Sequence, residues 1–390
     1  MLIRISAKNA FAYIAAFILM ASLLAAASPS GRTAFLTLSF LPEVLPNAPI
    51  RPLRWVTADP VRQPVEYPNA TGYGRADLYL PGEGAEHGAI LLFLGVNPAG
   101  RDDPRVVGLG NALARAGVVT MIPWSDSMTQ RRIAVGEIDN LVFAYQYLLQ
   151  HARVDPERAG MAGFCVGASL AMVAAQDARI SKDVRFINFF GGYFDGTDLI
   201  ASVAASTRYY PSIDQLDNQG ETQPWSPNEL TRQVVAAQLI EGVASQQERQ
   251  VLTELYQGNL ENIKADVDSF SPGARSVYGL LSGPKLADVP ALIDGLPAGT
   301  LASLRSISPS TRIGDLKARV LIMHDRQDDL VPSEESRRLA DSLGPDQVIR
   351  YTEFAFFQHV DPTRPVGPLT FLREAAKLYW HLYAVFQEVS

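Results

Sequence analysis

Arg158-Ala-Gly-Met-Ala-Gly-Phe-Cys-Val-Gly-Ala-Ser-Leu-Ala-Met-Val-Ala-Ala-Gln-Asp-Ala178 is the stretch that decides the fold of this chain of 390 residues. The apolar run that ends at Phe164 is typical of a buried strand, and the run from Ala168 onward is typical of a helix. Between them, residues 163–167 place a cysteine among small residues at a turn from strand to helix. This pattern predicts a nucleophile elbow, a G-x-S-x-G turn with cysteine in the serine position.

Each part of the predicted elbow has a physical reason. Gly163 and Gly167 relieve crowding at a sharp, strained turn, so that Cys165 projects from the edge of the sheet. The start of the following helix directs free N–H groups toward the sulfur and favours the thiolate, and the Val166 N–H is placed to bind an oxyanion. The alternative is that Cys165 is a small buried hydrophobe, the usual role of a lone cysteine. The order of strand, turn and helix favours the nucleophile.

Short apolar runs alternate with helical patterns along most of the chain after residue 74. Apolar runs predict strands at 89–95, 118–124, 158–164, 184–190, 320–324 and 348–354, and helical spacing predicts helices at 110–116, 133–149 and 168–178. Parallel strands joined by crossover helices produce such an alternation. We therefore expect an α/β fold with a mostly parallel sheet flanked by helices.

The expected core covers residues 71–195 and 312–390. Between these parts, residues 196–311 contain helical stretches, at 228–256 and 301–306, with no convincing strand. They form either a packed helical decoration or a cap over the carboxyl edge of the sheet, where open α/β folds bind their ligands. We favour the helical cap, because the insertion leaves the sheet directly after a strand.

The first 30 residues carry a membrane signal. Arg4 and Lys8 precede residues 10–28, which are uncharged and mostly apolar. A positive start followed by an apolar block is typical of a signal anchor or a cleaved signal peptide. The length of the block favours a retained anchor, three consecutive alanines near its end offer a cleavage site, and a buried soluble helix is the third possibility. Either membrane interpretation places the rest of the chain outside the cytoplasm, anchored or, after cleavage, secreted or periplasmic.

Residues 31–70 are rich in proline, with most of the prolines between positions 42 and 68. Proline lacks the N–H that helices and sheets use. We therefore expect an irregular entry segment rather than regular structure.

Composition excludes several classes of function. Apolar residues make up 47% of the chain, which is ample for a buried core, and the formal net charge of −7 argues against binding to nucleic acid. A single cysteine excludes an internal disulfide framework and a site with several thiolate ligands. The sequence has no glycine-rich phosphate loop and no metal-ligand cluster, so no cofactor is implied, and the oligomeric state cannot be read.

The chain has five histidines from which a base for the thiol can come: His87, His151, His324, His359 and His381. His87 precedes its strand and therefore lies at the wrong end of the sheet, and two others belong to helices. His324 ends a strand directly before a run of acids. His359 follows the strand at 348–354 in a loop before the final helix, where an exposed base would reach the elbow. We favour His359 as the base and keep His324, or no base, as alternatives.

Three carboxylates compete for the acid in the loop after the strand at 320–324: Asp325, Asp328 and Asp329. A carboxylate in such a loop can accept the Nδ1 proton of the histidine and fix its tautomer. The alternative is that these carboxylates form only an exposed, solvated run of charges. The order along the chain is cysteine, aspartate, histidine, which is the nucleophile–acid–base order of hydrolases built on this kind of sheet.

The chain resembles the α/β-hydrolases, and among them the dienelactone hydrolase family, whose elbow carries cysteine. The resemblance covers about residues 74–195 and 312–390 and rests on five segments, at 94–98, 114–117, 154–158, 163–167 and 328–332. In the last of these the family's catalytic aspartate lies four residues before a proline, which implies Asp328. The resemblance thus implies a catalytic triad of Cys165, Asp328 and His359.

The chain also departs from that family. Dienelactone hydrolases hold a glutamate near the end of the strand before the oxyanion loop, and no acid occurs here between Gly88 and Gly100. The helical insertion is also foreign to those compact enzymes. We therefore take the fold and the triad from the resemblance, but not the dienelactone substrate.

These observations predict a hydrolase that cleaves a small-molecule ester, lactone or thioester through an acyl-enzyme intermediate. The Val96 N–H, in the loop after the strand at 89–95, is the expected second oxyanion donor beside that of Val166. One alternative is acyl transfer, because the elbow also looks like that of polyhydroxyalkanoate synthases. The other is a non-catalytic binding module on a hydrolase fold.

Overall fold

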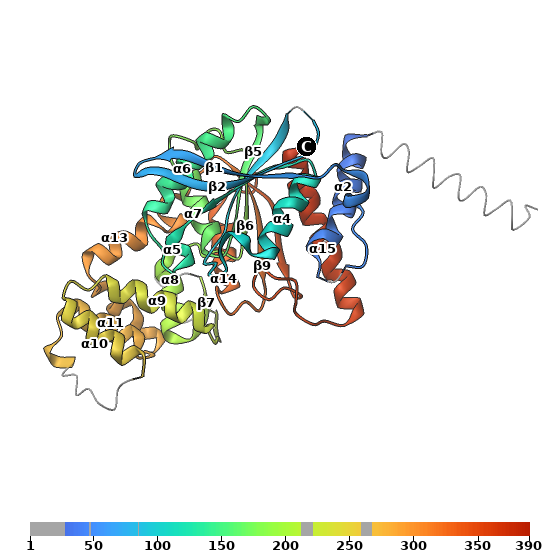
Figure 1. Cartoon of the computed structure of the whole chain (residues 1–390). Coiled ribbons are helices and arrows are strands. Elements are labelled where there is room, and N and C mark those ends of the chain that lie inside the picture. Colours follow the sequence, from blue (N-terminus) through green and yellow to red (C-terminus); the bar gives the residue numbers. More distant parts are fainter. Residues whose placement is uncertain (1–27, 47, 85, 212–220, 259–266) are drawn as a thin grey trace, which may run out of the picture.

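The computed structural model describes residues 28–46, 48–84, 86–211, 221–258 and 267–390. Their main feature is an eight-stranded sheet in the order β1-β2-β4-β3-β5-β6-β9-β10. Figure 1 shows the sheet edge-on through the middle of the molecule, with helices on both sides. The strands are β1 Val61–Asn69, β2 Gly72–Leu80, β3 His87–Phe93, β4 Val119–Trp124, β5 Val154–Phe164, β6 Phe186–Phe190, β9 Arg319–Asp325 and β10 Val348–Phe354.

The sheet is mostly parallel, as predicted. Strands β3, β4, β5, β6, β9 and β10 pair in parallel, whereas β1 and β2 pair antiparallel and β2 joins β4 antiparallel. All the predicted strands occur, within a few residues of their expected ends. Parallel strands are covered on both faces, which explains their continuous apolar runs.

Three apolar clusters of described residues lie between the sheet and its helices, and two of them are large. One contains Leu141 and Tyr145 of α6 and most of α7. The other, on the opposite face, contains Leu113 of α4 and Phe386 of α15, together with Phe40. The helices of the core are α4 Pro104–Arg115, α5 Asp126–Thr129, α6 Gly136–Leu149, α7 Val166–Ala175, α14 Ser333–Ser342 and α15 Pro368–Val389, with a 3-10 turn η1 at Gly100–Asp102.

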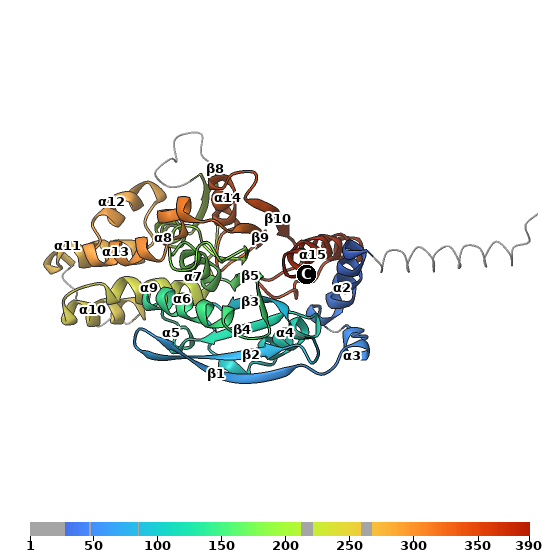
Figure 2. The ribbon, with the colours of Figure 1, turned by 90° about the horizontal axis from the view of Figure 1, so that it is seen from above.

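The segment between β6 and β9 is mostly helical and forms a separate layer, seen in yellow and orange in Figures 1 and 2. It also holds a short antiparallel pair, β7 Thr207–Tyr210 with β8 Glu221–Pro224, which the apolar pattern of the sequence did not reveal. Its helices are α8 Gly196–Ala205, α9 Glu229–Glu241, α10 Gln246–Tyr256, α11 Pro272–Leu281, α12 Val289–Asp294 and α13 Ala298–Ser306, with 3-10 turns η4 Val267–Ser269, η5 Leu286–Asp288 and η6 Pro309–Asp315.

The prediction of an irregular entry segment at 31–70 is wrong. Helix α2 covers Pro29–Val44, helix α3 covers Leu53–Val56, and β1 begins at Val61. Strand β1 tolerates Pro64 and Pro68 because it is an edge strand, where a missing N–H removes no necessary bond. The predicted membrane signal lies almost entirely outside the described residues. Among the residues that the structure does describe, no helix is long and apolar enough to cross a bilayer.

Candidate active site

The predicted elbow is a sharp turn between β5 and α7. Cys165 has φ 55° and ψ −140°, a backbone conformation that residues with a side chain rarely adopt. Its N–H donates to the carbonyl of Phe190 at the end of β6, at 2.9 Å, and its own carbonyl accepts from Ala168 N. The side chain is partly exposed. The strained turn thus leaves the cysteine partly exposed, while its side chain also packs against the main apolar cluster.

Three glycines make this turn possible. A Cβ added to Gly163 would lie 2.4 Å from the Cα of Ala168, and one added to Gly167 would lie 2.5 Å from the carbonyl oxygen of Phe93. A Cβ on Gly95 would lie 2.7 Å from the Cβ of Cys165. The elbow and the loop after β3 therefore pack backbone against backbone, which only glycine permits.

The two predicted oxyanion donors are the backbone N–H groups of Val166 and Val96. Val166 is the first residue of α7, and the first N–H groups of a helix have no partner within the helix. The loop of the second predicted donor, Val96, is held by a turn in which Gly100 N donates to the Asn97 carbonyl. Because Gly95 touches the elbow, this loop lies beside Cys165.

His359 lies in the loop between β10 and α15, beside the elbow. Its Nδ1 is 2.6 Å from Oδ2 of Asp328, which comes from a loop 31 residues earlier in the chain. Its Nε2 is buried and has no hydrogen bond of good geometry to the described residues. The ring also packs near Gly191, which directly follows the residue that binds Cys165 N. The structure thus brings Cys165, Asp328 and His359 together at the carboxyl edge of the sheet.

His359 and Asp328 each shift the pKa of the other toward its charged form. Burial disfavours a charged His359, but the charge of Asp328 and the interactions with Asp328 and Cys165 outweigh burial and raise the pKa of His359 well above its ordinary value. Burial alone would raise the pKa of Asp328, but the charge of His359 and hydrogen bonds from His324 and His359 hold it below its ordinary value. The ring is therefore a group that keeps a proton near the sulfur.

The other two acids of the loop have different partners. The carboxylate of Asp325 accepts from Gln327 N and His359 N and forms an ion pair with Arg364 at 2.6 Å. The carboxylate of Asp329 accepts from Asn228 of the insertion. Asp328 is therefore the only one of the three that reaches the His359 ring, and Asp325 fixes the backbone of the histidine loop.

Two residues that the sequence analysis considered as candidate acid and base, Asp325 and His324, have positioning roles that it did not foresee. The His324 ring is fully buried; its Nε2 lies 2.9 Å from the Val331 carbonyl and 3.4 Å from Asp328, and its Nδ1 lies 2.6 Å from the Ser336 hydroxyl. The ring therefore supports the acid loop and not the thiol. A histidine directly before an acid run is the only sequence signal for this role.

The remaining histidines have structural partners. His87 lies at the start of β3 near the Glu83 carbonyl, His151 accepts from Arg153 N, and His381 lies between Thr352 and Asn188. Among the described residues, no three or more His, Cys, Asp or Glu side chains gather as they would around a metal ion.

The insertion is fastened to the acid loop. Trp225 Nε1 donates to the Asp328 carbonyl at 2.8 Å, Asn228 N donates to the Asp329 carbonyl at 2.6 Å, and the Thr231 hydroxyl donates to the Leu330 carbonyl at 3.0 Å. These bonds hold the backbone of three consecutive residues. The insertion thus contributes to the geometry of the site as well as lying next to it.

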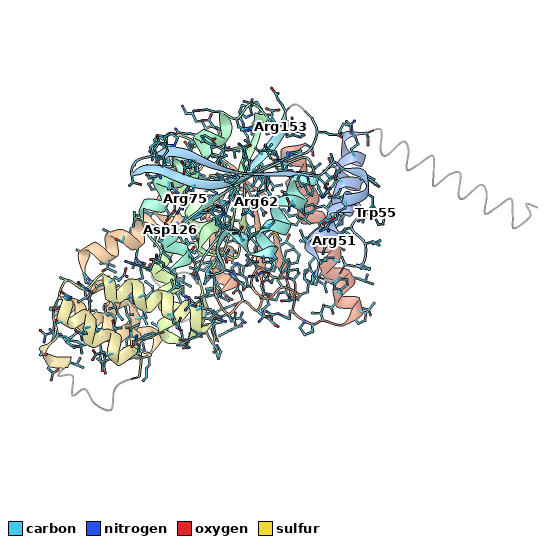
Figure 3. The ribbon with its side chains drawn as sticks, in the orientation of Figure 1. Arg51, Trp55, Arg62, Arg75, Asp126 and Arg153 are labelled. Carbon is cyan, nitrogen blue, oxygen red and sulfur yellow. The ribbon has the colours of Figure 1, made fainter. Side chains whose placement is uncertain are left out.

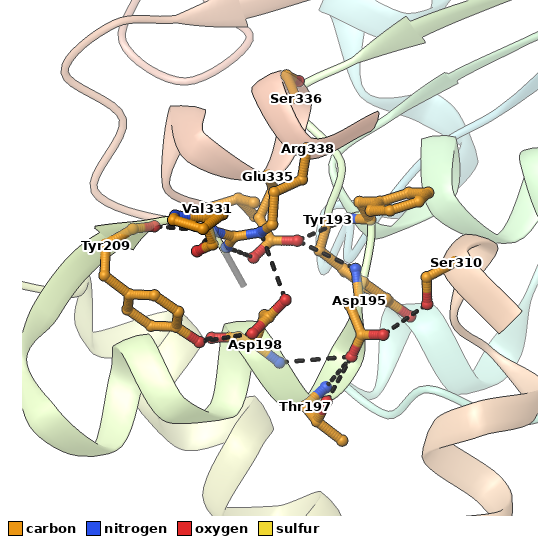
Figure 4. A network of polar contacts seen from close by, with 12 residues as sticks. Tyr193, Asp195, Thr197, Asp198, Tyr209, Ser310, Val331, Glu335, Ser336 and Arg338 are labelled. Atoms are coloured by element: carbon orange, nitrogen blue, oxygen red, sulfur yellow. Dashed lines mark hydrogen bonds and ion pairs between the residues drawn. The ribbon is translucent and has the colours of Figure 1, made fainter. Parts of the chain in front are cut away.

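A buried polar network ties the beginning of the insertion to α14 (Figure 4). One oxygen of Glu335 accepts from the N–H groups of Phe194 and Asp195, where the chain leaves the sheet. Arg338 pairs with Glu335 and lies 3.4 Å from Asp198 of α8. Because each buried charge has a partner of opposite sign, the network can fix this junction without leaving an unpaired charge.

We compared the chain with protein families, curated proteins and solved structures. No model of a protein family matches the chain, and no curated protein matches it. Solved structures do match. A puromycin-hydrolysing peptidase of Mycobacterium tuberculosis is 15% identical with a TM-score of 0.47, over 83% of this chain and 39% of that one. An acylaminoacyl peptidase of Pyrococcus horikoshii is 12% identical with a TM-score of 0.48, over 83% and 41%.

A hyperthermophilic esterase from Pyrobaculum calidifontis is 12% identical with a TM-score of 0.44, over 90% of this chain and 91% of the esterase. The chain spans about two fifths of the length of the peptidases, so nothing about their activity carries over to it. The order of the strands, with the elbow at the end of β5, decides the fold class. The chain has the α/β-hydrolase fold. In this fold the elbow, the acid loop and the histidine loop meet at one edge of the sheet.

Proposed function

We propose that the protein is a cysteine-dependent hydrolase that cleaves a carboxylic ester, lactone or thioester through an acyl-enzyme. The observation that carries the proposal is the orientation of the His359 ring, with its two nitrogens in different surroundings. Its Nδ1 is bound to a buried carboxylate at 2.6 Å, and its Nε2 is left without another partner beside the strained cysteine. A histidine oriented in this way can exchange a proton with the sulfur and with substrate groups.

In the first half of the reaction, the proton of the Cys165 thiol passes to His359, unless the two side chains already rest as an ion pair. The sulfur attacks the carbonyl carbon, a C–S bond forms, and the carbonyl oxygen becomes an oxyanion held by the N–H groups of Val166 and Val96. When the intermediate collapses, the bond to the leaving alcohol or thiol breaks, and His359 gives its proton to that group. One oxyanion donor contributes about 10²–10³-fold to the rate.

In the second half, a water molecule attacks the acyl carbon of the thioester. His359 takes a proton from this water, the second tetrahedral intermediate breaks its C–S bond, and the proton returns to the sulfur. The products are a carboxylic acid and the free enzyme. Asp328 stays ionised throughout. Its carboxylate orients the His359 ring and stabilises the positive form of that ring.

The test is a panel of p-nitrophenyl esters and acyl thioesters of increasing chain length, with Cys165→Ala as the control. Turnover that disappears in this variant supports the proposal. In parallel, iodoacetamide should label the single cysteine quickly near neutral pH and much more slowly in His359→Ala. Equal and slow labelling of both proteins would favour a non-catalytic module. Acyl transfer to an added alcohol or thiol in preference to water would favour an acyltransferase.

A further inference from the structure

Helix α2 has apolar side chains on its outer side as well as its inner side. It buries Phe40 together with Thr33, Thr37 and Ser39, and it leaves Phe35 and Leu38 64% and 60% exposed. The two threonine hydroxyls donate to carbonyls four residues earlier, so they are satisfied within the helix. A surface helix of a protein in water usually has a polar outer side. The pattern indicates that the outer side of α2 meets an apolar environment.

The apolar surface continues onto neighbouring elements. Helix α15 packs along α2, with the Tyr379 hydroxyl donating to the Ala34 carbonyl and with Phe40 and Phe386 in edge contact at 5.0 Å. Figures 1 and 2 place α2, α3 and α15 at one end of the molecule, and Figure 3 shows Trp55 there. We call the exposed large apolar side chains of these three helices the α2–α15 face: Phe35, Leu38, Trp55, Val56, Leu369, Phe371, Leu372 and Trp380.

A groove of about 490 Å³ extends this face toward the histidine loop. It lies between the segment after His359 and the first turns of α15, and Phe356, Pro365, Phe371 and Leu372 line it. Its walls are mostly apolar. The groove therefore continues the apolar character of the face to the loop that carries His359.

The most exposed charged side chains of these helices are arginines. They are Arg32, Arg54 and Arg373, and Arg54 lies 3.5 Å from Glu43. The acids of α2 and α15, Glu43, Glu374 and Glu388, have largely buried side chains that are paired with basic residues. Exposed arginines beside tryptophans and leucines match the boundary between anionic headgroups and acyl chains.

We propose that the α2–α15 face lies on a lipid bilayer and holds the body of the protein against the membrane surface. The uncharged run at 10–28 ends at the residue before α2, so a leader inserted in the bilayer would deliver α2 to the membrane surface. The two exposed tryptophans, Trp55 and Trp380, would then lie at headgroup depth, where this side chain is favoured. The proposal does not depend on the reaction that the site performs.

The four tryptophans of the chain provide the test, because the leader contains none. Trp55 and Trp380 belong to the face, whereas Trp124 and Trp225 donate hydrogen bonds to Asp77 and to the Asp328 carbonyl. The full-length protein is reconstituted in vesicles of phosphatidylcholine and phosphatidylglycerol, with and without bromine on the acyl chains. Brominated lipid should quench a large share of the emission. The quenching should be lost in Trp55→Phe/Trp380→Phe and kept in Trp124→Phe/Trp225→Phe.

A second pair of variants tests the face without touching tryptophan. Leu38→Glu/Leu372→Glu should abolish the quenching, and Tyr73→Glu, at a side chain 75% exposed on the distant β1–β2 hairpin, should not. Iodoacetamide labelling of Cys165 should stay unchanged in both and show that the site is folded. Quenching that is equal in all variants, or protein that does not float with the vesicles, would overturn the proposal. A dimer seen by sedimentation in which Trp55 and Trp380 are shielded from solvent without any lipid would also overturn it.

Discussion

The elbow and the acid–histidine pair meet at one edge of the sheet, but they are built in opposite ways. The elbow is five consecutive residues whose backbone is strained at Cys165 and crowded at its glycines. The pair comes from two loops 31 residues apart. His359 N donates to Asp325, and His324 and the insertion bind carbonyls of the acid loop. The position of the nucleophile therefore depends on local sterics, whereas the position of the base depends on hydrogen bonds between distant parts of the chain.

The largest expected effect concerns the strained residue itself. Cys165→Ala and Cys165→Gly should each lower ester turnover by at least about 10⁴-fold, since both remove the sulfur. They should differ in stability. Cys165→Gly should be more stable than Cys165→Ala by about 1 kcal/mol, because glycine adopts a positive φ without strain. Urea unfolding measures the difference, and equal stabilities would mean that the turn stores no strain.

The next effect separates the three acids. Asp328→Asn should lower turnover by about 10³–10⁴-fold, because the amide favours the wrong tautomer of His359. Asp329→Asn is the matched control, since its side chain contacts the insertion, and should change turnover by less than about 3-fold. Steady-state kinetics decide the matter. Comparable losses in the two variants would show that the loop as a whole, and not the bond to His359, matters.

Crowding at the elbow predicts a loss of stability. Gly163→Ala should lower the free energy of unfolding by about 3 kcal/mol, because its Cβ would lie 2.4 Å from the Cα of Ala168. Gly108→Ala in α4 is the control, since its Cβ would meet no atom within 4 Å, and it should stabilise by about 0.5–1 kcal/mol. Chemical denaturation of both variants tests the prediction, and two variants of equal stability would contradict it.

The pair also predicts how stability depends on pH. The pKa of His359 is raised well above 6.5, so its contribution is complete below pH 6.5 and is lost as the pH rises through the raised value. The pKa of Asp328 is lowered, so the same pair contributes above pH 3.8 and fails as the pH falls through the lowered value. Urea unfolding of wild type and His359→Gln should therefore show a stability difference that shrinks on the alkaline side. A difference that grows there would have the wrong sign.

The smallest effect concerns the insertion. Trp225→Phe removes the hydrogen bond to the Asp328 carbonyl and should lower both turnover, by about 5-fold, and stability, by about 1 kcal/mol. Trp124→Phe also removes a tryptophan hydrogen bond, but at the opposite part of the sheet, and should lower stability only. Kinetics and unfolding of the two variants distinguish a bond that positions the acid loop from one that only stabilises the fold.

Most of the sheet could be predicted from the sequence, because buried parallel strands are continuous apolar runs. Strand β1 could not, since its two prolines indicate irregular structure unless one knows that it is an edge strand. Helix α2 was missed for a different reason. Its buried side mixes Phe40 with Thr33, Thr37 and Ser39, and Phe35 and Leu38 lie on its exposed side, so the apolar pattern does not single out one face.

The sequence by itself determined the class of fold, the position of the elbow and His359 as the preferred base, because hydrophobic period and glycine spacing act between residues close in the chain. It left Asp325, Asp328 and Asp329 open, and only the resemblance to a known family singled out Asp328. The tertiary structure decided which carboxylate reaches the imidazole and turned His324 from a rival base into a support. Those outcomes depend on hydrogen bonds between loops far apart in sequence, and no local pattern records where such loops meet.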